Sequence, residues 1–194
     1  MINKNNFFEN LKQSIDLLDK KKLDNLIKEI KKIKNNKGRI FFLGVGGSAG
    51  NSSHAVNDFR KICNIECYSP VDNVSELTAR TNDEGFDKIF SKYLINSNLS
   101  KKDAIFIMSV GGGNKKLNIS TNLIEAILVA KKKKTKVFSI VGRKDGYAYK
   151  KSNISILIKV NERKLLTPIS ESMQAVIWHF IVTDKRLQSN KTKW

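Results

Sequence analysis

The sequence predicts a three-layer α/β sandwich that is doubly wound around a parallel sheet of five strands. Short apolar runs without polar alternation recur along the chain, which is typical of strands buried on both faces. Segments with apolar residues at helical spacing separate these runs, and two of the runs end in glycine-rich turns. With 194 residues, 40% of them hydrophobic, the chain suffices for one domain with a sizeable core, and we expect residues 1–194 to form it.

The chain opens with a helical segment, which we assign to residues 1–36. Seven apolar side chains recur in it at helical spacing: Phe8, Leu11, Ile15, Leu18, Leu23, Ile27 and Ile30. We expect two helices with a break near residues 18–24. Because so small a domain leaves them little sheet to cover, these helices should form core or subunit contacts. The α/β core is expected over residues 37–187.

Five short apolar segments are expected to form the sheet: residues 39–43, 65–68, 104–108, 136–141 and 154–160. Five segments with helical periodicity lie between and after them: residues 52–62, 74–80, 86–94, 121–133 and 170–185. This alternation of strand and helix indicates parallel strands with helices on both faces of the sheet.

The charge of the chain is strongly basic, because 36 lysines and arginines oppose 18 acidic residues and give a formal net charge of +18. Such a charge is compatible with nucleic acid as a partner. However, only six of the 36 are arginine, and the lysine runs at residues 20–22, 31–32 and 131–134 contain no aromatic residues that could stack on bases. We interpret the runs as solvated surface and expect no nucleic-acid partner.

Membrane and secretory segments are not expected. No stretch approaches 18 uninterrupted apolar residues, and the N-terminal segment is charged and amphipathic. Cys63 and Cys67 lie four residues apart without a second pair that would complete a zinc site. We therefore expect reduced thiols and a cytoplasmic protein without a membrane partner.

The first glycine-rich turn, residues 44–50, lies between an expected strand and an expected helix. Glycines let the backbone approach an anion, and a helix N-terminus offers free N–H groups and a partial positive charge. The spacing of Gly44, Gly46 and Ala49 also satisfies the dinucleotide-binding fingerprint, with Glu66 about twenty residues further on. The turn alone is therefore compatible with a phosphate site, with a nucleotide cofactor and with a tight turn that binds nothing.

The second glycine-rich turn, residues 109–114, follows the strand at residues 104–108, and Ser120 stands at the expected N-cap of the next helix. In an open α/β sheet the carboxyl ends of adjacent strands line one crevice, so both turns can converge on one phosphate. A nicotinamide site needs only the first turn. Two glycine-rich turns with serines therefore favour a sugar phosphate as ligand.

The two histidines of the sequence each lie on an expected helix with a carboxylate on a compatible face. His54 and Asp58 are one helical turn apart, and Glu171 and His179 are eight residues apart, about 80° around the helix axis. Two histidines and two carboxylates suit a divalent ion such as Zn²⁺, and they equally suit general acid–base chemistry. Each histidine alone is compatible with an ordinary helix position, but the link of the first pair to the glycine turn favours a joint site.

These features occur together in a known family. Six of them, in order, resemble the sugar isomerase (SIS) domain and, within it, the phosphoheptose isomerases, also called sedoheptulose-7-phosphate isomerases. They are residues 44–48, His54, residues 81–86, the turn at Ser109, residues 141–146 and the helix from Glu171 to His179. The resemblance covers about residues 1–185 and implies a flavodoxin-like sheet and a homotetramer with active sites between subunits.

The resemblance further implies a ketose/aldose isomerase that converts sedoheptulose 7-phosphate to a D-glycero-manno-heptose 7-phosphate through an enediol, the first step of activated heptose biosynthesis. Asp58 and His179 match the catalytic base and acid, which fits the need to move a proton between C1 and C2. The residues that match metal ligands, for an ion such as Zn²⁺, are His54, Asp58, Glu171 and His179. The residues expected to bind the substrate and its phosphate are Gly47, Ser48, Asn82, Asp83, Ser109, Gly111, Ser120 and Glu171.

The sequence departs from the family pattern at several of these positions. Asp58 stands where a longer glutamate is usual, Glu171 where glutamine is usual and Gly111 where a serine is usual, and residues 113–118 look inserted. Two alternatives remain: a non-catalytic SIS protein that binds a sugar phosphate or regulates a partner, and a small nucleotide-cofactor protein. The presence of both histidines and both carboxylates counts against the first, and the second glycine-rich turn counts against the other.

Overall fold

Strand β1 (Ile40–Leu43) shows why the apolar runs form strands buried on both faces. In the computed structural model, which describes residues 4–191, all four of its side chains are buried. Phe42 packs in one apolar cluster, whereas Phe41 and Leu43 pack in the other. Because successive side chains of a strand point to opposite faces, a strand between two helical layers needs an apolar residue at every position.

The sheet contains five parallel strands in the order β2-β1-β3-β4-β5, which confirms the predicted fold class. The remaining strands are β2 (Cys67–Tyr68), β3 (Ala104–Ser109), β4 (Lys136–Val141) and β5 (Ile154–Leu157). Phe42, Phe106 and Phe138 pair across β1, β3 and β4, with neighbouring ring centroids 5.1 and 6.3 Å apart. This row of aromatic rings forms the floor on which one helical layer packs.

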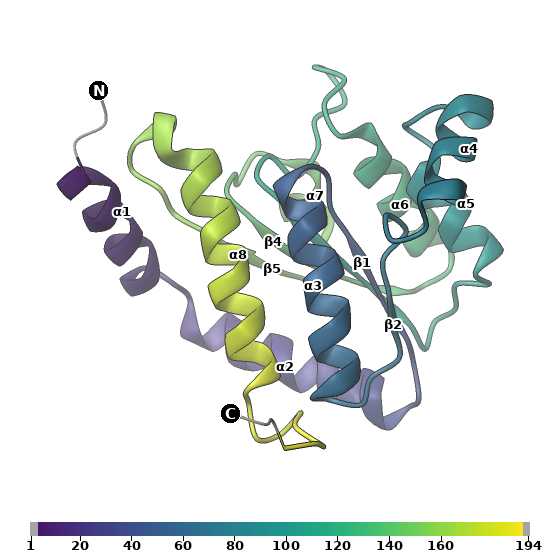
Figure 1. The fold of residues 1–194 in the computed structure, drawn as a ribbon, viewed down its shortest axis with the longest axis horizontal. Helices are drawn as coiled ribbons and strands as arrows, with labels where there is room; N and C mark the ends of the chain where they lie inside the picture. Colours follow the sequence, from purple (N-terminus) through teal and green to yellow (C-terminus); the bar gives the residue numbers. More distant parts are fainter. Residues whose placement is uncertain (1–3, 192–194) are drawn as a thin grey trace.

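Two layers of helices enclose the sheet (Figure 1). One layer contains α1 (Lys4–Asp16), α2 (Lys20–Asn35), α3 (Gly47–Lys61) and α8 (Leu166–Val182). The other contains α4 (Val74–Glu84), α5 (Ile89–Asn96), α6 (Thr121–Lys132) and α7 (Tyr147–Lys151). The first layer places α3 and α8, which are far apart in the sequence, next to each other.

The N-terminal segment forms two helices, as predicted. The break lies at residues 17–19, at the start of the expected interval, because the Asp19 side chain caps α2 by accepting a hydrogen bond from the N–H of Lys22 at 2.9 Å. α2 then buries five aliphatic side chains at helical spacing: Leu23, Leu26, Ile27, Ile30 and Ile33. α2 is therefore part of the core and packs against β5.

The differences from the sequence prediction lie mainly at the ends of elements. α3 begins at Gly47 instead of residue 52, because the glycine-rich turn itself forms the first helical turn. β5 ends at Leu157, and α8 begins at Leu166 instead of residue 170. The short helix α7 is absent from the prediction, since five residues are too few to show a helical period.

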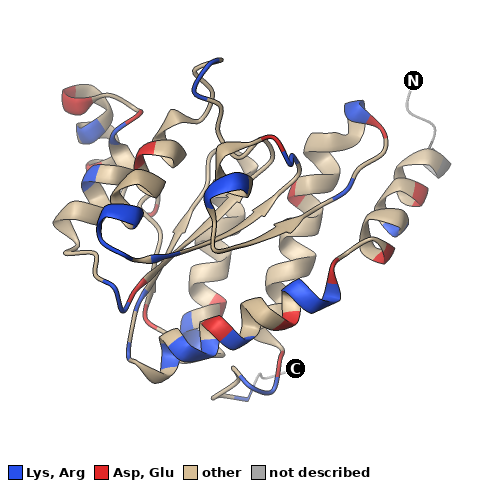
Figure 2. Cartoon of the chain, turned by 180° about the vertical axis from the view of Figure 1, so that it is seen from behind, with Lys and Arg blue, Asp and Glu red and all other residues tan. Residues whose placement is uncertain are grey.

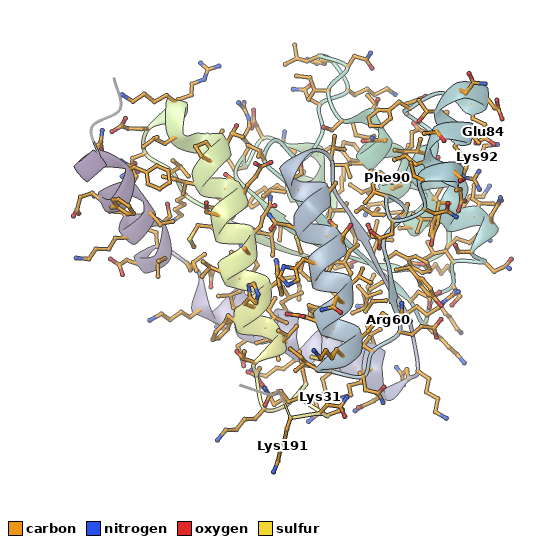
Figure 3. All side chains as sticks on the ribbon, in the orientation of Figure 1. Lys31, Arg60, Glu84, Phe90, Lys92 and Lys191 are labelled. Atoms are coloured by element: carbon orange, nitrogen blue, oxygen red, sulfur yellow. The ribbon has the colours of Figure 1, made fainter. Side chains whose placement is uncertain are left out.

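Charged side chains lie on the outside of the molecule, with the exception of the buried Asp103. All lysines of the three runs are exposed, as predicted, and Figure 2 shows basic positions along α2 and at the turn after α6. Figure 3 shows Lys31, Arg60 and Lys191 pointing into solvent, whereas Phe90 of α5 is buried. None of the helices formed by residues 4–191 is long and apolar enough to cross a membrane.

Cys63 and Cys67 are free, buried thiols, in agreement with the expected reduced state. Burial raises the pKa of the Cys63 thiol to about 11, and it also raises the pKa of Cys67. Both side chains therefore stay protonated at neutral pH and act as small apolar core residues.

Candidate active site

The two glycine-rich turns meet at one edge of the sheet, because β1 and β3 are hydrogen-bonded neighbours. In the first turn, a Cβ on Gly44 would lie 2.8 Å from the backbone nitrogen of Ala49, and Gly46 adopts a φ of +62°. Both positions need glycine for this tight return of the chain. As a result, α3 starts directly at the carboxyl end of β1.

A cavity of about 670 Å³ opens beside the first turn. Val45 of that turn lines it, and Ser120 lines it from the start of α6. Phe86 and Asp87 from the connection between α4 and α5, together with Glu125 of α6, also line it. This space is large enough for a small phosphorylated ligand.

The serines of the two turns differ in their surroundings. Ser120 is the N-cap residue of α6, but its φ of +48° is left-handed and its side chain does not cap the helix, so the hydroxyl remains available at the cavity. Ser109 is buried, and its hydroxyl accepts a hydrogen bond from the N–H of Gly112 at 2.9 Å. Ser48 is buried in the first turn of α3, and Gly111 lines a smaller adjacent cavity of about 100 Å³.

Asn82 and Asp83 lie on α4, a helix that buries none of its residues within this chain. Both are exposed, and the Asn82 amide donates a hydrogen bond to the Asp83 carboxylate at 2.7 Å. They do not line the large cavity, whereas Phe86 and Asp87, a few residues later, do. Sequence reasoning missed these two, although the segment that contains Phe86 was part of the family resemblance.

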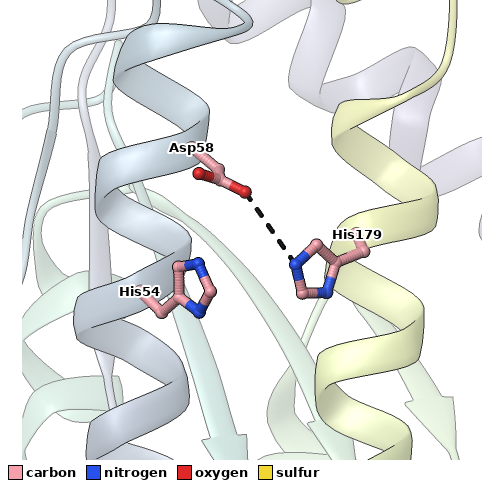
Figure 4. Close-up of side chains that lie close together, drawn as sticks. All are labelled: His54, Asp58 and His179. Atoms are coloured by element: carbon pink, nitrogen blue, oxygen red, sulfur yellow. Dashed lines mark ion pairs between the residues drawn. The ribbon is translucent and has the colours of Figure 1, made fainter. Parts of the chain in front are cut away.

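Three of the four expected metal-ligating residues come together on α3 and α8 (Figure 4). His54 and Asp58 lie on one face of α3, and His179 reaches them from α8. One ligand atom from each residue lies within 4.8 Å of the other two, and Asp58 Oδ2 is 3.9 Å from His179 Nε2. The first and the last helix of the α/β core therefore form one side-chain cluster, which we call the histidine cluster.

The orientation of the His179 ring is fixed by the backbone. Its Nδ1 atom lies 2.8 Å from the carbonyl oxygen of Ala175, one turn earlier on α8. A carbonyl oxygen only accepts hydrogen bonds, so Nδ1 carries a proton, and in the neutral ring Nε2 presents its lone pair toward Asp58. The fully buried Trp178 ring lies 3.5 Å from the His179 ring and 4.7 Å from the His54 ring, between centroids, and supports both imidazoles.

Glu171 is not part of the histidine cluster, which corrects the expected set of four ligands. The angle around α8 is favourable, but eight residues also correspond to about 12 Å along the helix axis, too far for the side chains to meet. The Glu171 carboxylate lies instead against Gly47, in the space that a side chain at position 47 would occupy. Asn51 fixes this pairing of α3 with α8, since its amide donates hydrogen bonds to the Glu171 carbonyl and to Gln174 Oε1 at 2.9 and 3.0 Å.

The histidine cluster fits a divalent ion such as Zn²⁺. Two imidazoles and one carboxylate are ligands that zinc prefers, and three protein ligands leave a fourth position open, as in catalytic zinc sites. Ligand atoms around a tetrahedral zinc ion lie about 3.4 Å apart. The observed separations of up to 4.8 Å require the three side chains to approach one another by up to about 1.4 Å, which rotamer adjustments of the exposed imidazoles and the half-buried carboxylate supply.

The chain is similar to several known proteins. The sequence matches the profile of the SIS domain over residues 6–142. It is 29% identical over 127 residues to a phosphoheptose isomerase of Buchnera aphidicola, covering 63% of this chain and 62% of that protein. It is 27% identical over 150 residues to the lincomycin biosynthesis protein LmbN of Streptomyces lincolnensis, covering 73% of this chain and 54% of LmbN. The matched part thus spans less than two thirds of the length of these two relatives.

The structure is similar to that of the phosphoheptose isomerase GmhA from Neisseria gonorrhoeae, with a TM-score of 0.77, 22% sequence identity and 91% of each chain covered. At this identity the likeness shows a common fold. The profile match extends over more than half of the chain and includes both glycine-rich turns and the α3 residues of the histidine cluster. The chain belongs to the SIS domain family.

Proposed function

We propose that the chain is a sugar-phosphate isomerase that converts sedoheptulose 7-phosphate to a D-glycero-manno-heptose 7-phosphate, the first step towards an activated heptose. The observation that carries this proposal is the histidine cluster, of which His54 and Asp58 lie on the helix that begins at the first glycine-rich turn. The name of the Buchnera relative, phosphoheptose isomerase, supports the class of substrate.

The length of α3 between the two ends of the site supports a long substrate. His54 and Asp58 follow Gly47 by about 10 and 16 Å along the helix axis. Helical side chains lean toward the helix N-terminus, which shortens this gap. A substrate whose phosphate lies at the glycine-rich turns therefore needs an extended carbon chain to bring its carbonyl group to the cluster, as a seven-carbon sugar has.

Asp58 and His179 carry the proposed proton transfers. Asp58 removes a proton from C1 of the ketose while His179, which starts with both ring nitrogens protonated, donates its Nε2 proton to the oxygen on C2, which gives the enediol. Asp58 then returns its proton to C2, and the hydroxyl on C1 gives its proton back to His179, which leaves the aldose. Both residues end in their starting states. The hydrogen bond from Nδ1 to Ala175 keeps Nε2 as the exchanging nitrogen.

The same three residues, His54, Asp58 and His179, would hold a divalent ion such as Zn²⁺. When bound, this ion would take the place of the Nε2 proton of His179, and it would polarise the sugar carbonyl and stabilise the negative charge that develops on the enediol oxygens. The choice of imidazole and carboxylate donors and the orientation of the His179 lone pair support this assignment.

The exposure of the cluster supports active sites that a second subunit completes. His54 and His179 are both exposed, and apolar Val176 and Phe180 are exposed on the same helix as His179. Isomerases exclude water from the reacting enediol, which a single copy of this chain does not do at these residues. We propose a homotetramer in which residues 1–36 form subunit contacts around α/β cores of residues 37–187.

An isomerase assay with sedoheptulose 7-phosphate, before and after chelation, tests the proposal. We expect turnover by the zinc-loaded protein, its loss on chelation and its return when Zn²⁺ is added back. His179→Ala should abolish turnover but keep the affinity for inorganic phosphate, because the turns and not the end of α8 hold the phosphate. Binding of the sugar phosphate without any turnover by the zinc-loaded protein would instead identify a non-catalytic sugar-phosphate-binding protein. Turnover that persists after complete chelation would show that the proton transfers by Asp58 and His179 need no divalent ion.

A further inference from the structure

We propose that Lys115 is a phosphate-binding residue that supplies the cation for an anionic group in the cavity that Val45 and Ser120 line. The identity of the anion, the phosphate of a sugar, rests on the proposed function. The presence of an anion site at Lys115 does not, because it is argued from the position of Lys115 at the cavity and from its lack of an ion-pair partner among residues 4–191.

Lys115 is held by a short hairpin between β3 and α6, formed by residues 114–119. Asn114 and Ile119 exchange two backbone hydrogen bonds, of 2.8 and 3.0 Å. The Asn114 side chain also accepts a hydrogen bond from the N–H of Leu117 at 3.1 Å. The hairpin projects from the sheet edge where the turns meet, and Figure 2 shows basic positions at its tip. These bonds give the hairpin a defined shape, which fixes the side from which Lys115 approaches the cavity.

The charged side chains of the cavity wall differ in their partners. Asp87 and Glu125, the two carboxylates of the wall, share one cation, Lys88, at 3.2 and 3.0 Å. Lys115 lines the same cavity and forms no ion pair with any carboxylate among residues 4–191. Its ammonium group is therefore free to bind an anion beside the Ser120 hydroxyl, which also lines this cavity and does not cap its helix.

A phosphate group in this cavity needs such a cation. Hydrogen bonds between two charged groups are about twice as strong as those between neutral groups. The neutral donors here are limited, because Ser109 and Ser48 are buried and do not line this cavity. A lysine ammonium is a compact charge with three donors on a flexible stem, so it can follow a phosphate that several neutral groups also contact.

Lys116 provides a matched control. It adjoins Lys115 in the same hairpin, has the same charge and is also exposed, but it does not line the cavity. Neutralising either lysine changes the net charge of the protein equally. Only Lys115 should affect the affinity of an anion bound within the cavity.

Calorimetric titration with inorganic phosphate tests this inference on Lys115→Gln, Lys116→Gln and Lys115→Arg. We expect Lys115→Gln to weaken phosphate binding about tenfold, as loss of one charge-assisted hydrogen bond does. Lys116→Gln should keep wild-type affinity, and Lys115→Arg should retain most of it. In the assay with sedoheptulose 7-phosphate, Lys115→Gln should raise KM about tenfold with kcat nearly unchanged.

Equal phosphate affinities of Lys115→Gln and Lys116→Gln would overturn the inference. If the wild type turns over the sugar phosphate and KM is the same in Lys115→Gln, the role of Lys115 is wrong while the proposed function stands. If Lys115→Gln alone loses phosphate affinity and the wild type does not turn over the sugar phosphate, Lys115 is an anion-binding residue and the proposed function is wrong.

Discussion

The Nε2 atom of His179 lies 3.9 Å from the Oδ2 atom of Asp58. This pair of side chains connects α8, the last helix of the chain, to α3, the helix that follows β1. The backbone carbonyl of Ala175 orients the imidazole, and His54 stands one turn from Asp58 on α3. The pair therefore marks the end of the site where chemistry is expected. Gly47, at the N-terminus of α3, marks the end where an anion is expected.

The first prediction concerns the metal. His54→Ala or His179→Ala removes one of three ligands, so we expect zinc affinity to fall about a hundredfold or more, measured by competition with a chromogenic chelator. Glu171→Gln is the matched variant on α8 outside the cluster and should keep wild-type zinc affinity. A loss of zinc in Glu171→Gln as large as that in His54→Ala would contradict a site of three residues.

The second prediction concerns Glu171 and the phosphate. Its carboxylate lies at Gly47, where the free N–H groups and the partial positive charge of α3 favour an anion. A bound phosphate must share this region with the carboxylate or displace it. Glu171→Gln should therefore bind inorganic phosphate about two- to fivefold more tightly than the wild type at neutral pH and low salt.

Calorimetry at two ionic strengths checks this expectation, since salt should reduce the difference. Glu162→Gln, which removes a carboxylate next to Asn10 and away from the glycine-rich turns, serves as control for the change in net charge. Phosphate binding that is weaker in Glu171→Gln than in the wild type would show that the carboxylate assists the site.

Sequence patterns predicted the sheet because each buried strand is recognisable from a few consecutive apolar residues. A strand between two helical layers is buried and largely apolar, and the runs around Phe42, Phe106 and Phe138 show this, with Lys136 at the start of β4 as the exposed exception. The ends of helices were harder to predict, since α3 begins within glycines that carry no helical pattern. The five residues of α7 lie below the length at which a period can be recognised.

Site residues were predictable where the spacing along one helix was sufficient. The pair His54 and Asp58 follows from a separation of one turn. The expectation for Glu171 considered the angle around α8 but not the rise of about 12 Å along it. Lys115 and Phe86 reach the cavity because two separate connections meet beside Val45, and no pattern within either segment contains that information.

The third prediction concerns stability at low pH. The Asp103 carboxylate accepts hydrogen bonds from the Arg39 side chain at 2.9 and 3.2 Å and from the Arg39 and Ser100 N–H groups. Burial opposes ionisation of Asp103, but these hydrogen bonds outweigh it and hold the pKa of the carboxyl below its ordinary value. A lowered pKa in the folded state means that the ion pair stabilises the fold above the unfolded-state pKa and that this stability is lost as the pH falls through the folded-state pKa.

Asp103→Asn should lower the free energy of unfolding at pH 7 by about 3 kcal/mol, because it leaves Arg39 partly buried without its partner. The difference from the wild type should shrink as the pH falls below 4, which urea unfolding at several pH values measures. Asp145→Asn breaks an exposed pair with Arg143 and should change stability little. Equal effects of the two substitutions at pH 7 would contradict this account.

The fourth prediction concerns assembly. Phe180 and Val176 are 52% and 46% exposed on α8, at the edge of an apolar groove of about 360 Å³ that α1 and α2 also line. Such a surface beside the histidine cluster suits contact with a second copy of the chain, which would also shield His179 from water. Phe180→Asp should therefore dissociate the tetramer and reduce isomerase turnover, because it places a charge in an apolar contact.

Light scattering at micromolar concentration checks the mass, and circular dichroism checks that Phe180→Asp remains folded. Leu128→Asp is the matched control, since Leu128 is 45% exposed on α6 in the opposite helical layer. Leu128→Asp should leave the mass unchanged if the contacts are made by α1 and α8. A wild-type protein that is monomeric yet fully active would show that one chain completes the site alone, because His179 would then act in an exposed position without a partner subunit.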